Sequence, residues 1–197
     1  DESFALGGGI YVGFNASAVI TGNTIKANRA GALATLYQTS EGGGVVIASR
    51  VTAVETKVSG NLFTGNFVAD AGGGLSLEEY DPLTLPIEPS QGTIDNNIFE
   101  SNNADDGAAI DVHESLAKIY NNTIHNNTAR SEAGGVYFGA PTTAGNVAEF
   151  VNNLLTSNVS PAGALAGGMY VEPLTNPVVR YNDLWGNAPT NVGGGGR

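Results

Sequence analysis

The sequence predicts an all-β protein, a single-domain right-handed parallel β-helix (a solenoid) of about six coils. A six-residue phrase, Asn-x-apolar-x-x-Asn, occurs six times in the chain. A second phrase, two small residues followed by apolar-x-apolar, alternates with the first. The apolar starts of the second phrase are separated by 35, 30, 35, 26 and 33 residues. Repeats of about 20 to 50 residues are typical of solenoids, propellers and repeat arrays.

The first phrase keeps two asparagines and one large apolar residue at fixed offsets. We expect each asparagine position to form a ladder, because a side-chain amide both donates and accepts hydrogen bonds between stacked coils. Asparagine also tolerates left-handed turn geometry. The predicted ladder residues are Asn23, Asn61, Asn97, Asn122, Asn153 and Asn182 in one column, and Asn28, Asn66, Asn102, Asn127, Asn158 and Asn187 in the other.

Each repeat contains two or three short strands. An apolar residue always stands three positions before the first asparagine, as Ile20, Val58, Ile94, Ile119, Phe150 or Val179. The apolar-x-apolar part of the second phrase is a strand with one buried face, because successive strand residues point to opposite sides. The small pair before it predicts a bend where backbone passes close to backbone.

Other repeat folds fit less well. No 3.6-residue periodicity with helix caps is visible, and a propeller blade needs four strands in about 40–45 residues. Variable spacing suits a β-helix, whose turns can grow into loops. We expect one domain over residues 1–192 and a flexible glycine-rich tail over residues 193–197. We expect Trp185, in the last phrase, to cover the open end of the core.

Composition limits the partners. The chain is 41% hydrophobic and 14% charged, with 28 glycines and a net charge of −11. Nucleic acid is an unexpected partner, because its binding depends on Lys and Arg. We expect no membrane insertion, since no apolar run approaches about 20 residues. Without cysteine, disulfides and thiolate metal sites are excluded. The chain begins at Asp1, directly before a repeat, so we expect a mature product or a piece of a longer protein.

Both phrases and the closing segment Tyr181-Asn182-Asp183-Leu184-Trp185-Gly186-Asn187 resemble right-handed parallel β-helix repeat proteins of the pectin-lyase-like superfamily. The closing segment is similar to one in bacterial secreted β-helix proteins of the choice-of-anchor kind. The resemblance covers residues 7–191. It implies the fold, but little about activity, because the superfamily includes lyases, hydrolases, epimerases and adhesins.

Two outward columns follow from the strand alternation. The residue between the two inward apolar positions gives one column, Tyr11, Val46, Ser76, Asp111, Tyr137 and Tyr170. The residue two positions later gives the other, Gly13, Ala48, Glu78, His113, Gly139 and Glu172. The patch that these columns form is the candidate site, with Tyr11, Tyr137, Tyr170 and Glu172 as candidate ligand-binding residues. The resemblance implies that this sheet lines a substrate cleft.

One hypothesis for the patch is uronan epimerase or lyase chemistry. The segment Ile110-Asp111-Val112-His113-Glu114 resembles the Asp-Pro-His-Glu motif of mannuronan epimerases, in which a Tyr and a His act beside an Asp. The resemblance implies catalytic roles for Asp111, His113 and Tyr137. However, Val112 replaces the proline, and neither outward column contains a Lys or Arg to neutralise a uronate.

A second hypothesis is glycoside hydrolysis. Glu78 and Asp111 lie on adjacent coils, and carboxyl groups about 5 Å apart suit a retaining enzyme. Asp105-Asp106-Gly107 superficially resembles the paired aspartates of polygalacturonases, but the other motifs of that family are missing.

A third hypothesis is a calcium site, for which Glu78, Glu79, Asp81 and Asp111 offer hard oxygen ligands. The alternative to all three is a solvated acidic and aromatic face without a specific ligand.

The sequence favours a secreted or cell-surface, bacterial, structural or adhesive β-helix that contacts glycans or other surface proteins. The ends of a solenoid need protection against edge pairing. We therefore expect end-to-end self-association, or neighbouring coils of a longer chain. The alternative function is a polysaccharide-active enzyme that uses Asp111, His113, Tyr137 and Glu78.

Overall fold

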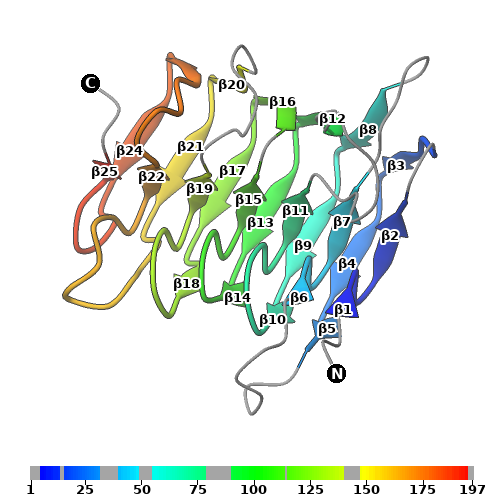
Figure 1. The fold of residues 1–197 in the computed structure, drawn as a ribbon, viewed down its shortest axis with the longest axis horizontal. Helices are drawn as coiled ribbons and strands as arrows, with labels where there is room; N and C mark the ends of the chain where they lie inside the picture. The colour runs from blue at the N-terminus through cyan, green and yellow to red at the C-terminus, as the bar shows by residue number, and fades with distance from the viewer. Residues whose placement is uncertain are drawn as a thin grey trace.

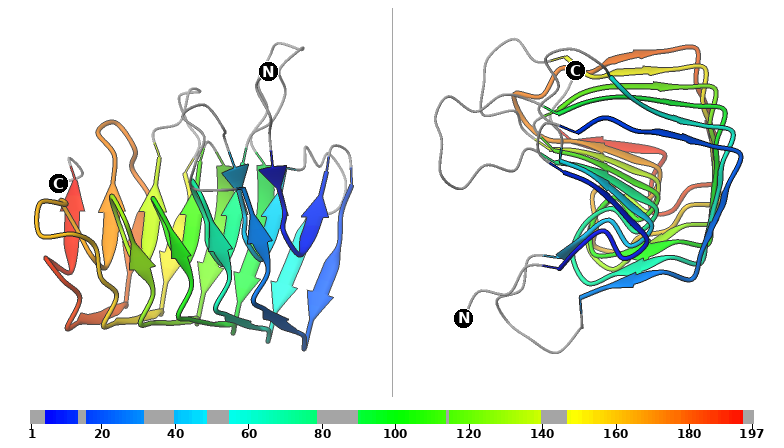
Figure 2. Two further views of the ribbon diagram at one scale, coloured as in Figure 1. Left: turned by 90° about the horizontal axis from the view of Figure 1, so that it is seen from below. Right: turned by 90° about the vertical axis from the view of Figure 1, so that its right-hand side faces the viewer.

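The structure is a computed structural model. It describes residues 5–13, 16–31, 40–48, 55–78, 90–113, 115–139 and 147–194. The chain winds into a stack of coils, with its two ends at opposite ends of the stack (Figure 1). Viewed along the stack, the coils superimpose as an angular outline whose sides are sheets (Figure 2).

Three parallel sheets form the long sides of the stack. The first, here called the glycine sheet, contains β2 (Ile10–Val12), β7 (Val45–Ile47), β11 (Leu75–Leu77), β15 (Ile110–Val112), β19 (Val136–Phe138), β22 (Met169–Val171) and β25 (Val192–Gly194). The second contains β3 (Val19–Thr21), β8 (Thr56–Ser59), β12 (Ser90–Asp95), β16 (Ser115–Tyr120), β20 (Glu149–Val151) and β23 (Val178–Arg180). The third contains β4 (Thr24–Lys26), β9 (Leu62–Thr64), β13 (Ile98–Glu100), β17 (Thr123–His125), β21 (Leu154–Thr156) and β24 (Asp183–Trp185).

Two smaller parallel sheets fill the side that leads into the glycine sheet. One has four strands, β5 (Arg29–Ala30), β10 (Phe67–Val68), β14 (Asn103–Ala104) and β18 (Thr128–Ala129). The other pairs β1 (Ala5–Leu6) with β6 (Ser40–Glu41). The predicted all-β parallel β-helix is therefore confirmed, with each strand of the described coils pairing to its counterpart one coil away.

The glycine sheet has one strand more than the other long sheets. β25 pairs with β22, so that Met169 lies opposite Val192 and Tyr170 opposite Gly193. The boundary expected after residue 192 thus falls inside a strand. Sheet pairing uses backbone groups, so the glycines can extend the sheet without side chains to signal it.

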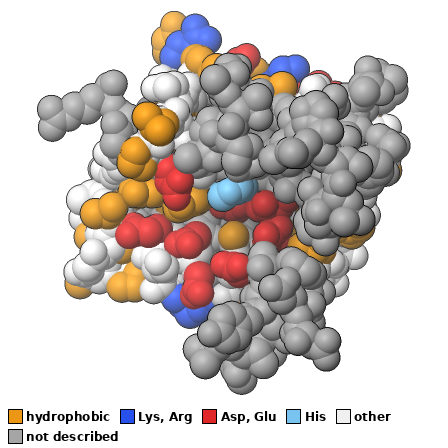
Figure 3. Space-filling model, in the orientation of Figure 1, with side chains coloured by type: hydrophobic (Ala, Val, Ile, Leu, Met, Phe, Trp, Pro, Cys, Tyr) orange, Lys and Arg blue, Asp and Glu red, His pale blue; other side chains and the backbone are white. Residues whose placement is uncertain are grey.

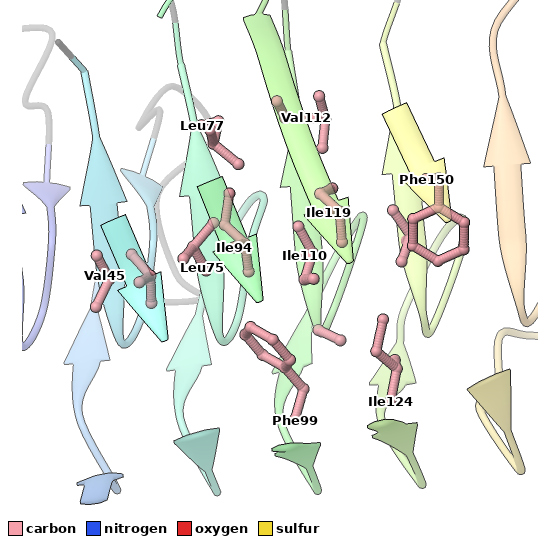
Figure 4. Packing of buried hydrophobic residues seen from close by; sticks show 14 of the residues in the cluster. Val45, Leu75, Leu77, Ile94, Phe99, Ile110, Val112, Ile119, Ile124 and Phe150 are labelled. Atoms are coloured by element: carbon pink, nitrogen blue, oxygen red, sulfur yellow. The ribbon is translucent and has the colours of Figure 1, made fainter. Parts of the chain in front are cut away.

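The core lies between the three long sheets and consists of the inward side chains of their strands, such as Leu75 and Leu77 of β11 (Figure 4). Residues three positions before the first asparagine are fully buried in the inner coils, as at Val58, Ile94 and Phe150. Phe63 and Phe99 stack in register, with ring centroids 4.5 Å apart. Apolar side chains of neighbouring coils therefore form continuous columns.

Both predicted asparagine ladders are present. In the inner coils each backbone N–H and each Nδ2 group donates to Oδ1 of the equivalent asparagine in the next coil. At Asn97, both donate to Asn122 Oδ1, at 2.9 and 3.0 Å. Asn97 Nδ2 also donates to the carbonyl oxygen of Val58, at 2.9 Å. The side chain of Asn97 is 1% exposed, so these bonds replace water at a buried corner.

The residues with left-handed backbone geometry are not the ladder asparagines. Tolerance of that geometry, which was expected to favour asparagine there, is therefore not the reason for it. The residue immediately before each ladder asparagine has a φ between 54° and 66°. These residues are Gly22, Gly60, Asn96, Asn121, Asn152 and Tyr181 at the first corner, and Ala27, Gly65, Ser101, Asn126, Ser157 and Gly186 at the second. Asparagine is therefore required in the ladders for its amide.

The C-terminal end closes one ladder only. Asn191 Oδ1 accepts from Asn187 N–H and Nδ2, at 3.2 and 2.9 Å, in place of a further coil. The expectation that Trp185 covers the core is wrong. Strand alternation turns Leu184 inward, where it packs against the core, and leaves Trp185 outward and 57% exposed.

The two ends differ in exposure. Val179, at an inward position of the last coil, is 38% exposed, whereas its counterpart Ile20 in the first described coil is 6% exposed. End-to-end association stays a prediction, and among the described residues the exposed Val179 is apolar surface that it could bury. Sedimentation of the chain over a range of concentrations tests it, and a monomer at every concentration would contradict it.

Replacing a buried ladder residue should destabilise the fold. In Asn97→Ala, the Val58 carbonyl loses a donor, Asn61 N–H loses its side-chain acceptor, and Asn61 Nδ2 loses one of its acceptors. An unsatisfied buried polar group costs about 1–3 kcal/mol. We expect a loss of about 2–4 kcal/mol in the free energy of unfolding, measured by denaturant titration.

The matched control is Asn23→Ala, at the exposed start of the same ladder. Asn23 donates to Asn61 Oδ1 and to the carbonyl of Thr21, and no described residue donates to its Oδ1. Its loss should cost less than half as much. Equal losses in the two variants would show that ladder position does not matter.

Candidate functional site

A concave corner lies between the glycine sheet and the segment that enters it. One wall is the outward column of the glycine sheet, where Ser76, Asp111 and Tyr137 lie opposite one another on adjacent strands. The other, here called the entry wall, carries Glu41, Ala71 and Asp106, which are joined by single parallel bridges.

Positive-φ glycines make the bend between the walls. Gly72 has a φ of 72°, and a Cβ placed on it would lie 2.6 Å from the Cβ of Ser76. Gly42 and Gly107 occupy the same place in their coils, with φ of 60° and 52°. A side chain at this bend would collide with the outward residue of the strand that follows. The absence of a side chain at Gly42, Gly72 and Gly107 therefore lets the two walls face each other.

The corner holds a pocket of about 310 Å³. Its lining residues are Glu41, Asp70, Ala71, Glu78, Asp106, Asp111, His113 and Tyr137. Figure 3 shows acidic side chains gathered beside a histidine on this side of the molecule. Four predicted catalytic residues, Asp111, His113, Tyr137 and Glu78, thus lie around one pocket.

Both predicted outward columns have the expected register, but the middle of the first column is not solvated. Ser76 is fully buried and Asp111 is 1% exposed. Val46, in the same column, is fully buried as well. The entry wall covers this part of the column. Alternation gives the direction of a side chain, but not what the rest of the coil places in front of it.

The carboxyl groups of the pocket interact with one another, Glu78 with Asp111 and Glu41 with Glu78. Ser76 Oγ donates to Glu78 Oε1 at 2.7 Å and lies 3.5 Å from Asp111 Oδ2. The Ser76 hydroxyl thus lies between the two predicted catalytic carboxyls.

Burial shifts the acidity of these groups. Loss of solvation is the main cause that raises the pKa of Glu41 to about 9 and that of Asp111 to about 8. Burial, together with the neighbouring Asp111, raises the pKa of Glu78 well above its usual range. Burial also raises the pKa values of Asp70 and Asp106. At neutral pH part of the pocket thus consists of neutral carboxylic acids, which both donate and accept.

Tyrosines extend the pocket toward the C-terminal end. The rings of Tyr137 and Tyr170 stack with centroids 5.4 Å apart and an angle of 25° between their planes. The Tyr137 hydroxyl donates to Glu172 Oε1. Burial, and secondly this hydrogen bond, raise the pKa of Tyr137. Three of the four predicted ligand-binding residues are thus adjacent, whereas Tyr11 lies three strands from Asp111 and is 46% exposed.

The calcium hypothesis stays a prediction. Glu78 and Asp111 line the pocket, whereas Glu79 and Asp81 lie outside the described residues. Within the described part of the chain, no three His, Asp or Glu side chains converge as a metal-binding group.

The entry wall is the part of the site that sequence reasoning missed. Glu41 and Asp106 each stand four residues before the first residue of a glycine-sheet strand, at Val45 and Ile110. That constant offset is the signal that could have identified them. The adjacent Asp105 and Asp106 have different surroundings. Asp106 lines the pocket, whereas Asp105 accepts a hydrogen bond from Arg130 at 2.7 Å.

The chain matches the family described as "Right handed beta helix region" over residues 3–155. Because the match covers more than half of the sequence, the chain belongs to this family, and the predicted handedness is confirmed. The narrower similarity to bacterial choice-of-anchor proteins stays a prediction. No curated protein and no solved structure matches the chain. Among the described residues, no helix has the length and apolar character to span a membrane.

The pocket carboxyls should make stability depend on pH. The pKa of an unfolded Asp is about 3.9, so between pH 4 and 8 the unfolded chain is ionised while folded Asp111 keeps its proton. The stability that protonated Asp111 contributes is fully present below pH 4 and is lost as pH rises toward 8. The free energy of unfolding changes by about 1.4 kcal/mol per pH unit and proton, so the melting temperature should fall by about 3–6 °C per unit.

Asp111→Asn keeps the shape of the side chain but cannot ionise. Its melting temperature should fall less steeply between pH 5 and 8 than that of the natural sequence. Asp183→Asn, which replaces an exposed carboxyl in β24, should leave the slope unchanged. Identical slopes in all three proteins would show that Asp111 is already ionised at neutral pH.

Proposed function

We propose that the chain is a structural or adhesive β-helix module of a secreted or cell-surface protein, and that its pocket contacts glycans. One observation carries the glycan part, namely a pocket in which hydrogen-bonding carboxyls adjoin the stacked Tyr137 and Tyr170. Sugar rings present hydroxyl groups and apolar faces, which such a lining can match. A solenoid also supplies the extended surface that adhesion requires.

The lining favours a neutral glycan over a polyuronate. Five of the eight described residues that line the pocket are Asp or Glu, and none of the eight is Lys or Arg. A polymer carboxylate would therefore meet carboxyl groups there without a described Lys or Arg to neutralise it. Carboxylic acids that keep their protons can instead bond to neutral hydroxyl groups. We therefore propose neutral oligosaccharides as the ligand class.

A polysaccharide-active enzyme is the second candidate. The observation that favours it is the position of Asp111, His113 and Tyr137 around one pocket, where acid and base groups could act on the same substrate. Glu78 with Asp111 is one pair that could act, and His113 with an entry-wall aspartate is another.

Binding of neutral oligosaccharides tests the first proposal. Titration calorimetry with gluco-, manno- and chito-oligosaccharides should show binding at pH 6 that weakens by several-fold to about tenfold in Tyr170→Ala, because stacking contributes about 0.5–1.5 kcal/mol. Asp111→Asn should also weaken it, and Asp183→Asn should not. Absence of binding across the panel, with alginate and pectate included, would overturn the glycan proposal.

The same incubations, with and without calcium, distinguish the enzyme. Product that disappears in His113→Ala would replace the adhesive function with catalysis. The proposed location is tested by labelling intact cells of the source organism with an antibody to the chain. Signal only after the cells are opened would contradict a surface location.

A further inference from the structure

Arg130 lies outside the pocket but contacts both segments that carry the entry-wall aspartates. Its Nη2 donates to the carbonyl oxygens of Val68 and Ala69, at 3.1 and 2.7 Å. Asp70 follows directly. Arg130 Nε donates to Asp105 Oδ1 at 2.7 Å, and Asp106 comes next in the chain. We call this set of Arg130 contacts the clamp.

The clamp spans three coils. Nη1 of Arg130 donates to Asn103 Oδ1 at 2.6 Å, and the guanidinium lies 5.1 Å from the ring centroid of Phe67. Phe67 and Asn103 belong to strands β10 and β14, and Arg130 follows β18. These strands are only two residues long, and the bridges beyond them are single. The entry wall therefore has little sheet pairing of its own, and a side chain that ties its coils together has a large share in its geometry.

The clamp also separates the adjacent aspartates. Asp105 is held outside by Arg130, while Asp106 Oδ1 accepts from the backbone N–H of Glu132 at 2.7 Å and lines the pocket. Asp105 N–H bonds in turn to the carbonyl oxygen of Asp70, at 2.6 Å. A planar guanidinium with five donors suits this role, because one group reaches carbonyl and carboxylate acceptors at fixed angles.

We propose that Arg130 is a positioning residue for the pocket. It sets the places of Asp70 and Asp106, and keeps Asp105 out, without touching the ligand. This inference rests on the proposed glycan-binding function for its affinity effect, but not for its structural effect. The alternative is that Arg130 only fastens coils together, as any cross-coil ion pair does.

A matched control exists on another side of the helix. Lys118 bonds to Glu55 at 3.3 Å and joins residues 63 apart in sequence, while Arg130 and Val68 are 62 apart. Lys118 lies in β16 of the second sheet, away from the pocket lining. Lys118→Gln therefore removes a cross-coil contact without changing the entry wall.

Hydrogen exchange tests the positioning role without a ligand. The N–H of Gly72 donates to the Asp106 carbonyl, and that of Gly107 donates to the Glu132 carbonyl, both at 3.1 Å. In Arg130→Gln, amides over residues 70–74 and 105–109 should exchange at least about tenfold faster, while those over 110–112 stay protected. Lys118→Gln should leave all three segments unchanged. Uniform acceleration in Arg130→Gln, or none, would overturn the proposal.

Affinity for the neutral oligosaccharides is the second readout. Arg130→Gln should weaken binding by about tenfold at pH 6. Arg130→Lys should weaken it less, because lysine keeps the positive charge although it lacks the planar guanidinium. Adding Asp105→Asn to Arg130→Gln should restore part of the affinity, since it removes the carboxylate that the clamp no longer holds away. Full affinity in Arg130→Gln would overturn the proposal. If the natural chain binds no glycan, the glycan function fails and the exchange result alone decides this inference.

Discussion

The structure depends on one constraint, that equivalent positions of successive coils stay in register. The asparagine ladders enforce it at two corners, because each ladder oxygen accepts from the backbone N–H and the amide of the equivalent asparagine one coil away. A slip of one residue would break both ladders and turn the core residues outward. The Phe63–Phe99 stack and the outward column from Ser76 to Tyr170 exist because the ladders keep this alignment.

Register also explains how a pocket arises in a solenoid. A bend at Gly42, Gly72 and Gly107 repeats the same corner in three coils, and the side chains that line it differ from coil to coil. Where acids occupy both walls, burial raises their pKa values. The acidic pocket thus arises because the side chains of a few coils differ while the backbone bend stays the same.

The fold was predictable from the sequence to a large extent. The phrases specified the coils, the ladders, the inward columns and the register of the outward columns, because those features repeat and the period of a strand is two. The place of Trp185 was not predicted correctly, because it follows the inward Leu184 on the strand and so points outward instead of over the end of the core. β25 was missed because its glycines pair through backbone alone.

The candidate site, like the fold, was predictable only in part. The strand repeat is enough to predict that Glu78, Asp111, His113 and Tyr137 share one face. It does not predict that Glu41, Asp70 and Asp106 oppose them, that Asp111 is buried, or that Arg130 contacts the segments beside the pocket. These facts depend on the angle at which one side of a coil meets the next. A bend sets that angle, and periodicity along a strand carries no information about it.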